Sequence, residues 1–581
     1  MNNLSIIANL KSVCSKNSKK VAIIEKEMKI SYSDLSNRIE NICRLIYAQN
    51  VVNGSVVAIV MERGADMIAT LFSVWALGNV PIMIDVDYPE ERIHYMIDSS
   101  EAVLIITDGR KYGFLNEKSN VISVHERVES LSEFELINRK EDDDAYIIFT
   151  SGSTGEPKGI VWSYRNIFTY LEACYEFYNI SKQDVVLQQT SCSFDTFMEE
   201  VLPVLLVGGT LVVRKRYEIS TIDRIEKTLL ETGVTIFTAS PILINELNKC
   251  LDFHKLRLVI SGGDILRYSH INNLIERKVR VVNSYGPAEC TICASVHECQ
   301  ADEIEISIGK AWKNYNIYVV DENMKPVPND VVGEIVIGGP AVGKGYLNKK
   351  HEKNRFVFSE LEDGIVYKTG DMAIMKSCGE LEFRGRVDNQ LKINGYRIEI
   401  EEVEKAMLEE FALSDVLVRS EKDETGKLIL CAYYVAESFV HSSEFLDKLK
   451  NRLLVQMIPN KFFRVSEFAT TDNGMKKDRN ESLEDKIISC DNKVDNYAMD
   501  KLGKKIIEMW AEIIECKVEE VDPNISFVEL GGHSLNVMQL LAEIEEIFDI
   551  EIDYENMYSL LNLKSICNIV REQINKKIST Y

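Results

Sequence analysis

Residues 146–159 decide the fold, and they read Tyr146-Ile147-Ile148-Phe149-Thr150-Ser151-Gly152-Ser153-Thr154-Gly155-Glu156-Pro157-Lys158-Gly159. An apolar run typical of a buried strand leads into ten residues with three glycines, four hydroxyl side chains and one lysine. Loops of this composition wrap polyphosphate with backbone N–H groups, hydroxyls and a single cation. The pattern differs from G-x-x-x-x-G-K-[ST], because Gly159 follows Lys158. We therefore predict a phosphate loop after a strand, with an ordinary surface turn as the alternative.

Outward from this loop, short apolar runs alternate with segments of helical spacing. Between residues 20 and 340 the runs include 56–60, 102–106 and 256–260, whereas residues 222–231 have the apolar spacing of a helix. Such alternation predicts a multi-domain α/β architecture in which helices cover the sheets.

The pattern changes after residue 330. Short runs closed by glycine-rich turns over 330–385 predict a small antiparallel barrel or sheet. A compact α+β unit is expected next, with strands near 415–418 and 428–435. After a polar segment, amphipathic spacing predicts a small helical bundle from residues 500–516, 535–547 and 563–575.

Composition limits the classes of function. A chain of 581 residues is expected to hold two to four domains, and 45% hydrophobic with 27% charged residues is typical of a globular protein. The net charge of −24 disfavours binding to nucleic acid or to anionic membranes. No apolar window is long enough to span a bilayer, the first residues lack a secretion signal, and 13 scattered cysteines indicate reduced thiols. We expect a cytoplasmic protein.

Further short segments follow one another in a characteristic order. They are Ser31-Tyr32-Ser33-Asp34-Leu35, Gly78-Asn79-Val80-Pro81 with Asp85-Val86-Asp87-Tyr88-Pro89, Phe194-Asp195-Thr196-Phe197, Asn283-Ser284-Tyr285-Gly286-Pro287-Ala288-Glu289, Tyr367-Lys368-Thr369-Gly370-Asp371 and Gly385-Arg386-Val387-Asp388-Asn389-Gln390-Leu391-Lys392. With the phosphate loop, these segments resemble the ANL adenylating enzymes, and within them the amino-acid adenylation domains of non-ribosomal peptide synthetases. The resemblance covers nearly the whole chain.

This resemblance implies a domain organisation. It implies a large N-terminal subdomain over residues 1–387, built of α/β sheets with a small β-barrel, and a small α+β C-terminal subdomain over 388–482. Asp388 would be the hinge about which the small subdomain turns, although a polar loop residue without a special role is the alternative. A linker over 483–497 and a four-helix carrier bundle over 498–576 complete the expected order.

The same resemblance implies ATP and Mg²⁺ as cofactors. A carboxylate attacks the α-phosphate of ATP and yields an acyl adenylate, so the phosphate charge must be neutralised and positioned. Residues 150–158 would hold the β- and γ-phosphates, Glu289 the Mg²⁺, and Tyr285 the adenine face. Asp371 would accept hydrogen bonds from the ribose hydroxyls with Arg386 nearby, unless it merely caps a turn. Ala288 stands where the family usually has Thr, which puts one hydroxyl contact in doubt.

The catalytic lysine of the family normally lies in Asn-Gly-Lys-x-Asp-Arg. Here the segment is Asn473-Gly474-Met475-Lys476-Lys477-Asp478-Arg479, one residue longer. Alignment on Lys-x-Asp-Arg assigns the role to Lys476, and alignment on Asn-Gly puts Met475 there instead. Lys476 is our choice, and Lys477 stays open.

The family selects its substrate in a pocket of the large subdomain. The corresponding residues, closed by Lys476, are Asp195, Thr196, Glu199, Thr238, Ile260, Gly262, Ser284, Ile292 and Cys293. Asp195 would bind the α-ammonium group of an amino acid, because a buried carboxylate requires a cationic partner. Glu199 adds a second carboxylate to a long pocket, which resembles lysine-selective pockets most closely, then those for ornithine and arginine. The alternative for Glu199 is a solvated helix residue paired with a nearby cation.

Residues 527–535 match the attachment motif of peptidyl carrier domains. Ser534 precedes an amphipathic helix, where backbone N–H groups favour a phosphodiester, and by resemblance it carries 4′-phosphopantetheine. A helix-capping serine is the alternative. Partners would be a phosphopantetheinyl transferase, a small helper protein and, since the chain lacks condensation and thioesterase motifs, a downstream condensation-domain protein in trans.

The resulting hypothesis is a loading module of antibiotic biosynthesis that activates lysine or another basic amino acid and transfers it to its own carrier. Two other functions stay open. One is a carboxylate–CoA ligase, and the other is a carrier and docking protein whose adenylation is impaired by Met475.

Overall fold

The computed structural model describes residues 5–579 except 111, 116–117, 119, 127–133, 153–155, 251–254, 349–354, 389, 394–395, 423–427, 469–481, 484–485, 491–500, 515, 519–520, 522–526, 528–533, 549, 551 and 553–562. The chain divides into two compact units. Unit 1 comprises residues 1–88, 93–150 and 157–395, and unit 2 comprises residues 89–92, 151–156 and 396–581. The domain boundaries expected at 388, 483 and 498 stay predictions.

The largest sheet of unit 1 has nine strands in the order β15-β14-β13-β12-β11-β9-β10-β1-β2. Their bounds are β1 Val21–Glu25, β2 Met28–Ser31, β9 Val185–Gln188, β10 Thr210–Val213, β11 Ile236–Ala239, β12 Leu258–Ser261, β13 Arg280–Tyr285, β14 Ser295–Glu298 and β15 Lys310–Ala311. The strands from β1 to β13 in this order are parallel, whereas the edge pairings β1–β2, β13–β14 and β14–β15 are antiparallel. This is the α/β architecture that the alternating pattern predicts.

The second sheet of unit 1 has six strands in the order β6-β5-β3-β4-β7-β8. They are β3 Val56–Val60, β4 Val80–Ile84, β5 Leu104–Thr107, β6 Val121–Ser123, β7 Asp144–Thr150 and β8 Lys158–Ser163. Only the β7–β8 pair is antiparallel among the pairings recorded for these described strands. Residues 146–150 therefore lie in a strand, as their apolar run predicts.

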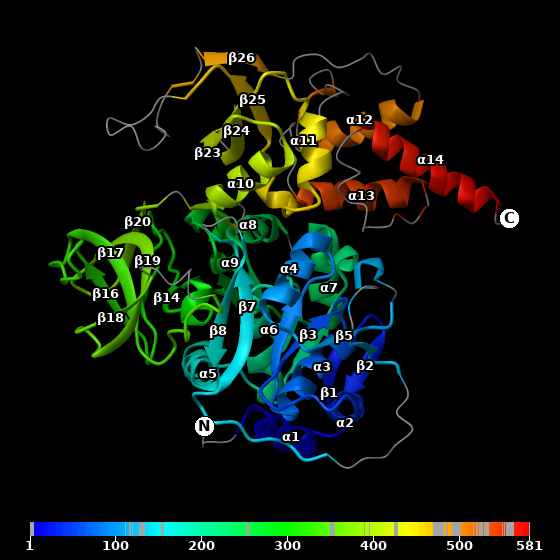
Figure 1. Cartoon of the computed structure of the whole chain (residues 1–581). Coiled ribbons are helices and arrows are strands. Elements are labelled where there is room, and N and C mark those ends of the chain that lie inside the picture. The colour runs from blue at the N-terminus through cyan, green and yellow to red at the C-terminus, as the bar shows by residue number, and fades with distance from the viewer. Residues whose placement is uncertain are drawn as a thin grey trace. The chain divides into compact units, whose positions relative to one another are not determined.

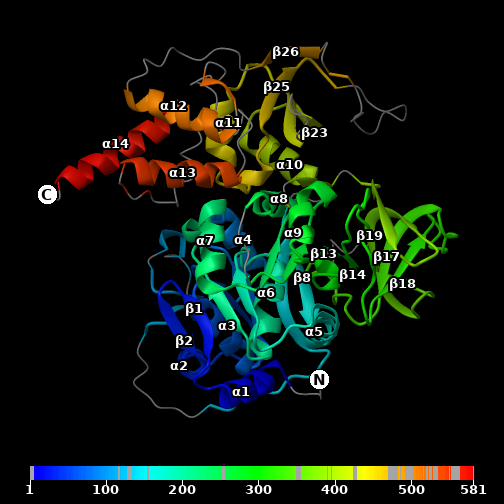
Figure 2. The same ribbon diagram turned by 180° about the vertical axis from the view of Figure 1, so that it is seen from behind.

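A third sheet of unit 1 contains five antiparallel strands. They are β16 Asn316–Val320, β17 Val332–Gly338, β18 Phe356–Ser359, β19 Gly364–Met375 and β20 Leu381–Arg386, followed by β21 Leu391–Ile393. Figures 1 and 2 show these strands in green as a group beside the two larger sheets of unit 1. The barrel or sheet expected over 330–385 is thus present as an antiparallel sheet.

Helices cover the two large sheets, and several begin at side-chain caps. They are α1 Ile6–Lys16, α2 Tyr32–Ala48, α3 Ala65–Ala76, α4 Glu90–Ser99, α5 Tyr164–Tyr178, α6 Thr196–Leu206, α7 Ile222–Thr232, α8 Pro241–Lys249 and α9 Asn272–Glu276. Ser31 and Asp34 form a capping box at α2, and Ser163 and Asn166 form another at α5. The motif Ser31-Tyr32-Ser33-Asp34-Leu35 therefore serves to start a helix.

Unit 2 contains an α+β part and a helical part. The first has β22 Tyr396–Ile398, α10 Ile400–Glu410, α11 Ser442–Leu449 and the sheet β23-β24-β25-β26, with β23 Asp415–Lys422, β24 Leu428–Val435, β25 Lys461–Val465 and β26 Ile487–Cys490. The second has α12 Lys501–Ile514, α13 Ser534–Phe548 and α14 Leu563–Ser579. Trp510, Leu541 and Ile566 pack in one buried cluster of these three helices. The fourth helix of the expected bundle has no counterpart among the described residues.

None of the described helices combines the length and the apolar character that crossing a membrane requires.

Candidate functional site

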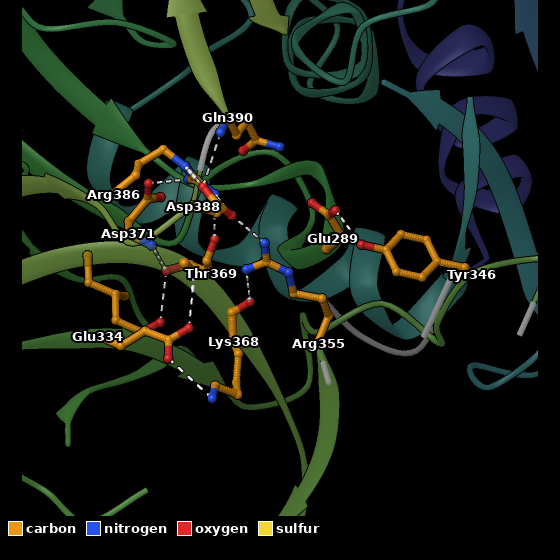
Figure 3. Close-up of polar contacts among 12 residues, drawn as sticks. Glu289, Glu334, Tyr346, Arg355, Lys368, Thr369, Asp371, Arg386, Asp388 and Gln390 are labelled. Carbon is orange, nitrogen blue, oxygen red and sulfur yellow. Dashed lines mark hydrogen bonds and ion pairs between the residues drawn. The ribbon is translucent and has the colours of Figure 1, made fainter. Parts of the chain in front are cut away.

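A buried charge cluster forms where β19 pairs with β20, which brings Asp371 opposite Arg386 (Figure 3). The two Asp371 oxygens have different partners. Oδ1 is paired with the Arg386 guanidinium, and Oδ2 accepts a hydrogen bond of 2.7 Å from the Tyr285 hydroxyl. The predicted nucleotide residues Tyr285, Asp371 and Arg386 therefore lie together.

Arg386 also holds Asp388, the predicted hinge residue. The Nε atom of Arg386 lies 2.7 Å from Asp388 Oδ1, and Arg355 binds the other carboxylate oxygen. Burial alone would raise the pKa of Asp388, but hydrogen bonds and the charges of the two arginines lower it below its usual range. Asp388 is thus an ionised, doubly paired side chain rather than a free loop residue.

Gly370 allows this cluster to close. Its φ of +75° lies in the left-handed region, and a Cβ there would come within 2.6 Å of Arg355 and 2.9 Å of both Arg386 and Asp388. The Gly370 N–H donates to the Glu334 carboxylate at 3.1 Å. The backbone can therefore approach the charges only because this residue has no side chain.

Glu289, the predicted Mg²⁺ ligand, is fully buried at the end of β13, in the short turn after Pro287. Its Oε1 accepts a hydrogen bond of 2.7 Å from the Tyr346 hydroxyl (Figure 3). Gly343 donates its N–H to the Glu289 carbonyl at 2.8 Å. A fully buried carboxylate supplies the hard oxygen ligand that Mg²⁺ prefers, so Glu289 fits the role chemically.

The phosphate loop is described only at its two ends. In unit 1, Thr150 pairs with Lys158 across β7 and β8, and the Thr150 hydroxyl is buried without a hydrogen-bond partner among the described residues. In unit 2, the Ser151 hydroxyl donates to the Arg397 carbonyl at 2.7 Å, and the Gly152 N–H donates to Glu402 at 3.1 Å. Ser153, Thr154 and Gly155 lie outside the described residues.

Helix α6 carries both acidic residues of the predicted pocket. Asp195 caps the helix and accepts a hydrogen bond of 2.8 Å from the Thr196 N–H. Glu199 follows one turn later, so the two carboxyl groups share a helix face. Glu199 is 5% exposed, which excludes the solvated helix residue considered as its alternative.

The remaining pocket residues come from the carboxyl ends of neighbouring strands and the segment after β13. Thr238 of β11 pairs with Ile260 of β12, and a Cβ on Gly262 would lie 2.9 Å from the Ser284 hydroxyl. Ile292 and Cys293 are buried in the segment before β14. The carboxyl ends of parallel strands are where ligands bind in open α/β sheets.

The electrostatics of Glu199 are unusual. Burial and, to a smaller extent, the charges of Asp195 and Glu200 raise its pKa to about 8, although hydrogen bonding from the Tyr170 hydroxyl at 2.8 Å and from Tyr178 lowers it. Cys293 lies in the electrostatic range of the same carboxyl. Asp195, Glu199 and Cys293 therefore share one environment.

Two further predicted residues, besides those of the phosphate loop, are not described at their side chains. Lys476 and its alternatives Met475 and Lys477 lie outside the described residues, and Ser534 is described only as the first residue of α13. Within the described part of the chain, no group of three or more His, Cys, Asp or Glu side chains is arranged to hold a metal ion.

The structure adds residues that the sequence reasoning missed. Tyr346 binds Glu289, Arg355 binds Asp388, and Tyr170 binds Glu199. Each lies 29 to 57 residues from its partner, so no local spacing connects them. The glycines at 343 and 345 beside Tyr346 were the one available signal, because such residues often mark a close backbone approach.

Comparison with known proteins identifies two matching families. The description "AMP-binding enzyme" matches residues 10–347, and "phosphopantetheine attachment site" matches residues 504–570. Bacitracin synthase 2 of Bacillus licheniformis is 31% identical over 571 residues, which cover 95% of this chain and 21% of that protein. Gramicidin S synthase 2 of Aneurinibacillus migulanus is 31% identical over 563 residues, which cover 95% of this chain and 13% of that protein. The chain thus spans about a fifth or less of the length of these curated relatives.

Solved structures share the fold. A non-ribosomal peptide synthetase protein with adenylation and PCP domains, bound to a vinylsulfonamide inhibitor, matches with a TM-score of 0.79 and 22% identity over 98% of this chain and 97% of that chain. The o-succinylbenzoate CoA synthetase of Bacillus subtilis matches with a TM-score of 0.73 and 21% identity over 82% of this chain and 98% of that chain.

Proposed function

Since the chain belongs to the AMP-binding enzymes and carries a phosphopantetheine attachment site, we propose that it activates a basic amino acid with ATP and loads it on its own carrier segment. The homology to bacitracin and gramicidin S synthases supports a role as a module of non-ribosomal peptide synthesis. The observation that carries the choice of substrate is the buried Glu199 one helical turn after Asp195.

The nucleotide would be held by the residues of unit 1. Asp371 is fixed by Arg386 and Tyr285, so its oxygens are already oriented to accept hydrogen bonds from ribose hydroxyls. Glu289 and the unpartnered Thr150 hydroxyl are oxygen ligands suited to Mg²⁺, which neutralises phosphate charge when bound. Lys158 ends the loop and supplies one cation. We assign the role of the catalytic lysine in adenylation to Lys476.

The amino acid would be bound by α6 and the strand ends. Asp195 takes the α-ammonium group, and Glu199 takes a distal cation. Gly262 and Ser284 are small residues, which would leave length in the pocket for a long side chain. A buried carboxyl needs a cationic partner, which supports lysine, with ornithine and arginine as alternatives. Thr196, Thr238, Ile260, Ile292 and Cys293 would form the rest of the wall.

Transfer would follow activation. The thiol of a 4′-phosphopantetheine arm on Ser534 takes the aminoacyl group from AMP after the 388–482 segment turns about Asp388. The arm is installed by a phosphopantetheinyl transferase, and the product passes to a condensation-domain protein.

Amino-acid-dependent ATP–pyrophosphate exchange over lysine, ornithine, arginine and neutral amino acids tests the first step. We expect exchange with a basic amino acid, followed by a mass increase of the carrier segment that corresponds to the aminoacyl thioester. Background exchange with every amino acid would favour the docking protein, and a soluble CoA thioester would favour the ligase.

A further inference from the structure

Two tyrosines of α5 lie at the inner end of the predicted pocket. Tyr170 and Tyr178 are 1% and 0% exposed, and both pack against Trp312 with ring centroids 5.7 Å and 5.2 Å away. The Tyr170 hydroxyl donates to Glu199 Oε1 at 2.8 Å. The Tyr178 hydroxyl is buried and makes no short hydrogen bond among the described residues, but it lies close enough to interact with the Glu199 carboxyl and to lower its pKa.

An unpartnered buried hydroxyl is costly and calls for an explanation. Within the described residues, the Tyr178 hydroxyl makes no short hydrogen bond and interacts with the Glu199 carboxyl of α6, whereas the neighbouring tyrosines make short hydrogen bonds. Tyr175 donates to the Pro203 carbonyl at 3.1 Å, and Tyr170 donates to Glu199. Among these three tyrosines of α5, only Tyr178, which lies beside Glu199, makes no short hydrogen bond within the described residues.

The adjacent carboxyl of Glu200 is also buried, but it accepts hydrogen bonds from several donors. It accepts hydrogen bonds from the backbone N–H groups of Gln189 and Thr190, from the Thr190 hydroxyl and from the Gln188 amide. Glu199 accepts one short hydrogen bond, from Tyr170, and interacts further with the Tyr178 hydroxyl, although a carboxylate can accept about four hydrogen bonds. Glu200 therefore stabilises the segment 188–190, whereas Glu199 can still accept hydrogen bonds from a ligand.

The groups that face Glu199 supply no cation. Asp195 and Glu200 come from its own helix, Tyr170, Cys174 and Tyr178 come from α5, and Cys293 comes from the segment before β14. No Lys or Arg among the described residues forms an ion pair with Glu199. The described residues therefore leave this carboxyl without a counter-charge, and a cationic ligand would supply one.

We propose that Tyr170 and Tyr178 complete a subsite that binds a primary ammonium group and discriminates against guanidinium. This inference rests on the proposed function and names the distal group of its substrate. An ammonium group has three donors, of which Glu199 Oε2 and the Tyr178 oxygen accept two. Tyr170 already occupies a lone pair of Glu199 Oε1, so the parallel two-bond geometry that guanidinium prefers is impaired.

Tyr170 is a positioning residue in this arrangement, and Tyr178 is a binding residue. Because both are phenols, replacement by Phe removes one oxygen and keeps the ring packed on Trp312. Tyr175→Phe is a matched control, since it removes a buried hydroxyl that links the same two helices without touching Glu199.

The test is ATP–pyrophosphate exchange by the full chain with lysine, ornithine, arginine and norleucine. Tyr178→Phe is expected to raise the KM for lysine about tenfold with kcat unchanged, because it removes a hydrogen bond to a charged group. Tyr170→Phe is expected to lower the preference for lysine over arginine by about tenfold, and to shift the pH profile of the lysine KM. Tyr175→Phe is expected to change none of these ratios.

Three results would overturn the subsite. They are wild-type enzyme that prefers arginine, Phe variants that change all four substrates by equal factors, and Phe variants indistinguishable from Tyr175→Phe. If the Tyr170 variant does not fold, Tyr178→Phe decides alone, because the Tyr178 hydroxyl makes no short hydrogen bond among the described residues and its loss should disturb the fold least. A wild-type enzyme that uses norleucine but no basic amino acid refutes the proposed substrate itself, which is a separate outcome.

Discussion

Lowering the pH from 8 to 6 is expected to weaken the use of lysine by about 50-fold, because Glu199 must lose its proton to bind a cation. Burial raises the pKa of Glu199 to about 8 in the empty pocket. About half of the enzyme is therefore ionised there at pH 8 and about one hundredth at pH 6, and each pH unit corresponds to about 1.4 kcal/mol of binding free energy. Above pH 8 the dependence should level off.

The assay is the KM for lysine in ATP–pyrophosphate exchange between pH 6 and pH 8.5. Norleucine is the control substrate, because it lacks the distal ammonium group of lysine but has the same α-ammonium and carboxylate groups. Any pH dependence of the other steps of exchange therefore affects both substrates. Glu199→Gln is the control variant, and its lysine KM should be high and independent of pH. A lysine KM that stays constant in the wild type, or that changes in parallel with norleucine, refutes the reasoning.

Thermal unfolding of the empty enzyme gives an independent measurement. The pKa of Glu199 is raised on folding, so the native state holds an extra proton between its ordinary pKa of 4.5 and the raised pKa of about 8. This contribution to stability is complete below the lower value and is lost as the pH rises through the upper one. The unfolding temperature of Glu199→Gln should therefore exceed that of the wild type at pH 8.5, by a margin that narrows toward pH 6.

Four further variants test other parts of the molecule. Gly370→Ala should destabilise the protein by about 1–3 kcal/mol in urea unfolding, since the left-handed backbone and the nearby charges leave no room for a methyl group, and an unchanged midpoint would contradict this. Asp371→Asn should raise the KM for ATP about tenfold and leave the KM for the amino acid unchanged, whereas equal changes in both would assign it a structural role. Ser534→Ala should retain pyrophosphate exchange and lose the aminoacyl mass increase, and a loaded variant would refute the carrier assignment. Lys476→Ala should lose most exchange but still transfer an aminoacyl group from supplied adenylate, so an unchanged exchange rate would shift the role to another residue.

Local patterns in the sequence predicted the elements well. The spacing of 222–231 predicted α7, which the structure places at Ile222–Thr232, and the run 56–60 is β3. The amphipathic spacing of 500–516 corresponds to α12 at Lys501–Ile514. These predictions succeed because periodicity reports directly on which face of an element is buried.

Long-range partners could not be predicted in the same way. The hydroxyls of Tyr346 and Tyr170 reach Glu289 and Glu199 from other elements, and no spacing rule connects positions so distant in sequence. Resemblance identified the acids at these positions, but not the groups that hold them, because the partner of a buried carboxyl is set by tertiary packing. The sequence also does not indicate that Glu200 accepts several hydrogen bonds whereas the neighbouring Glu199 accepts few, because two adjacent glutamates look alike in the sequence.

The hydrogen bond between Tyr170 and Glu199 has a consequence for redesign of this enzyme. Replacing the glutamate alone by an apolar residue, to admit a neutral substrate, would remove the acceptor of the Tyr170 hydroxyl and the carboxyl that the Tyr178 hydroxyl faces. Two buried hydroxyls without acceptors would then oppose the new specificity with about 1–3 kcal/mol each. Successful retargeting therefore has to alter α5 together with α6, so that the helix behind the pocket evolves with the residues that face the substrate.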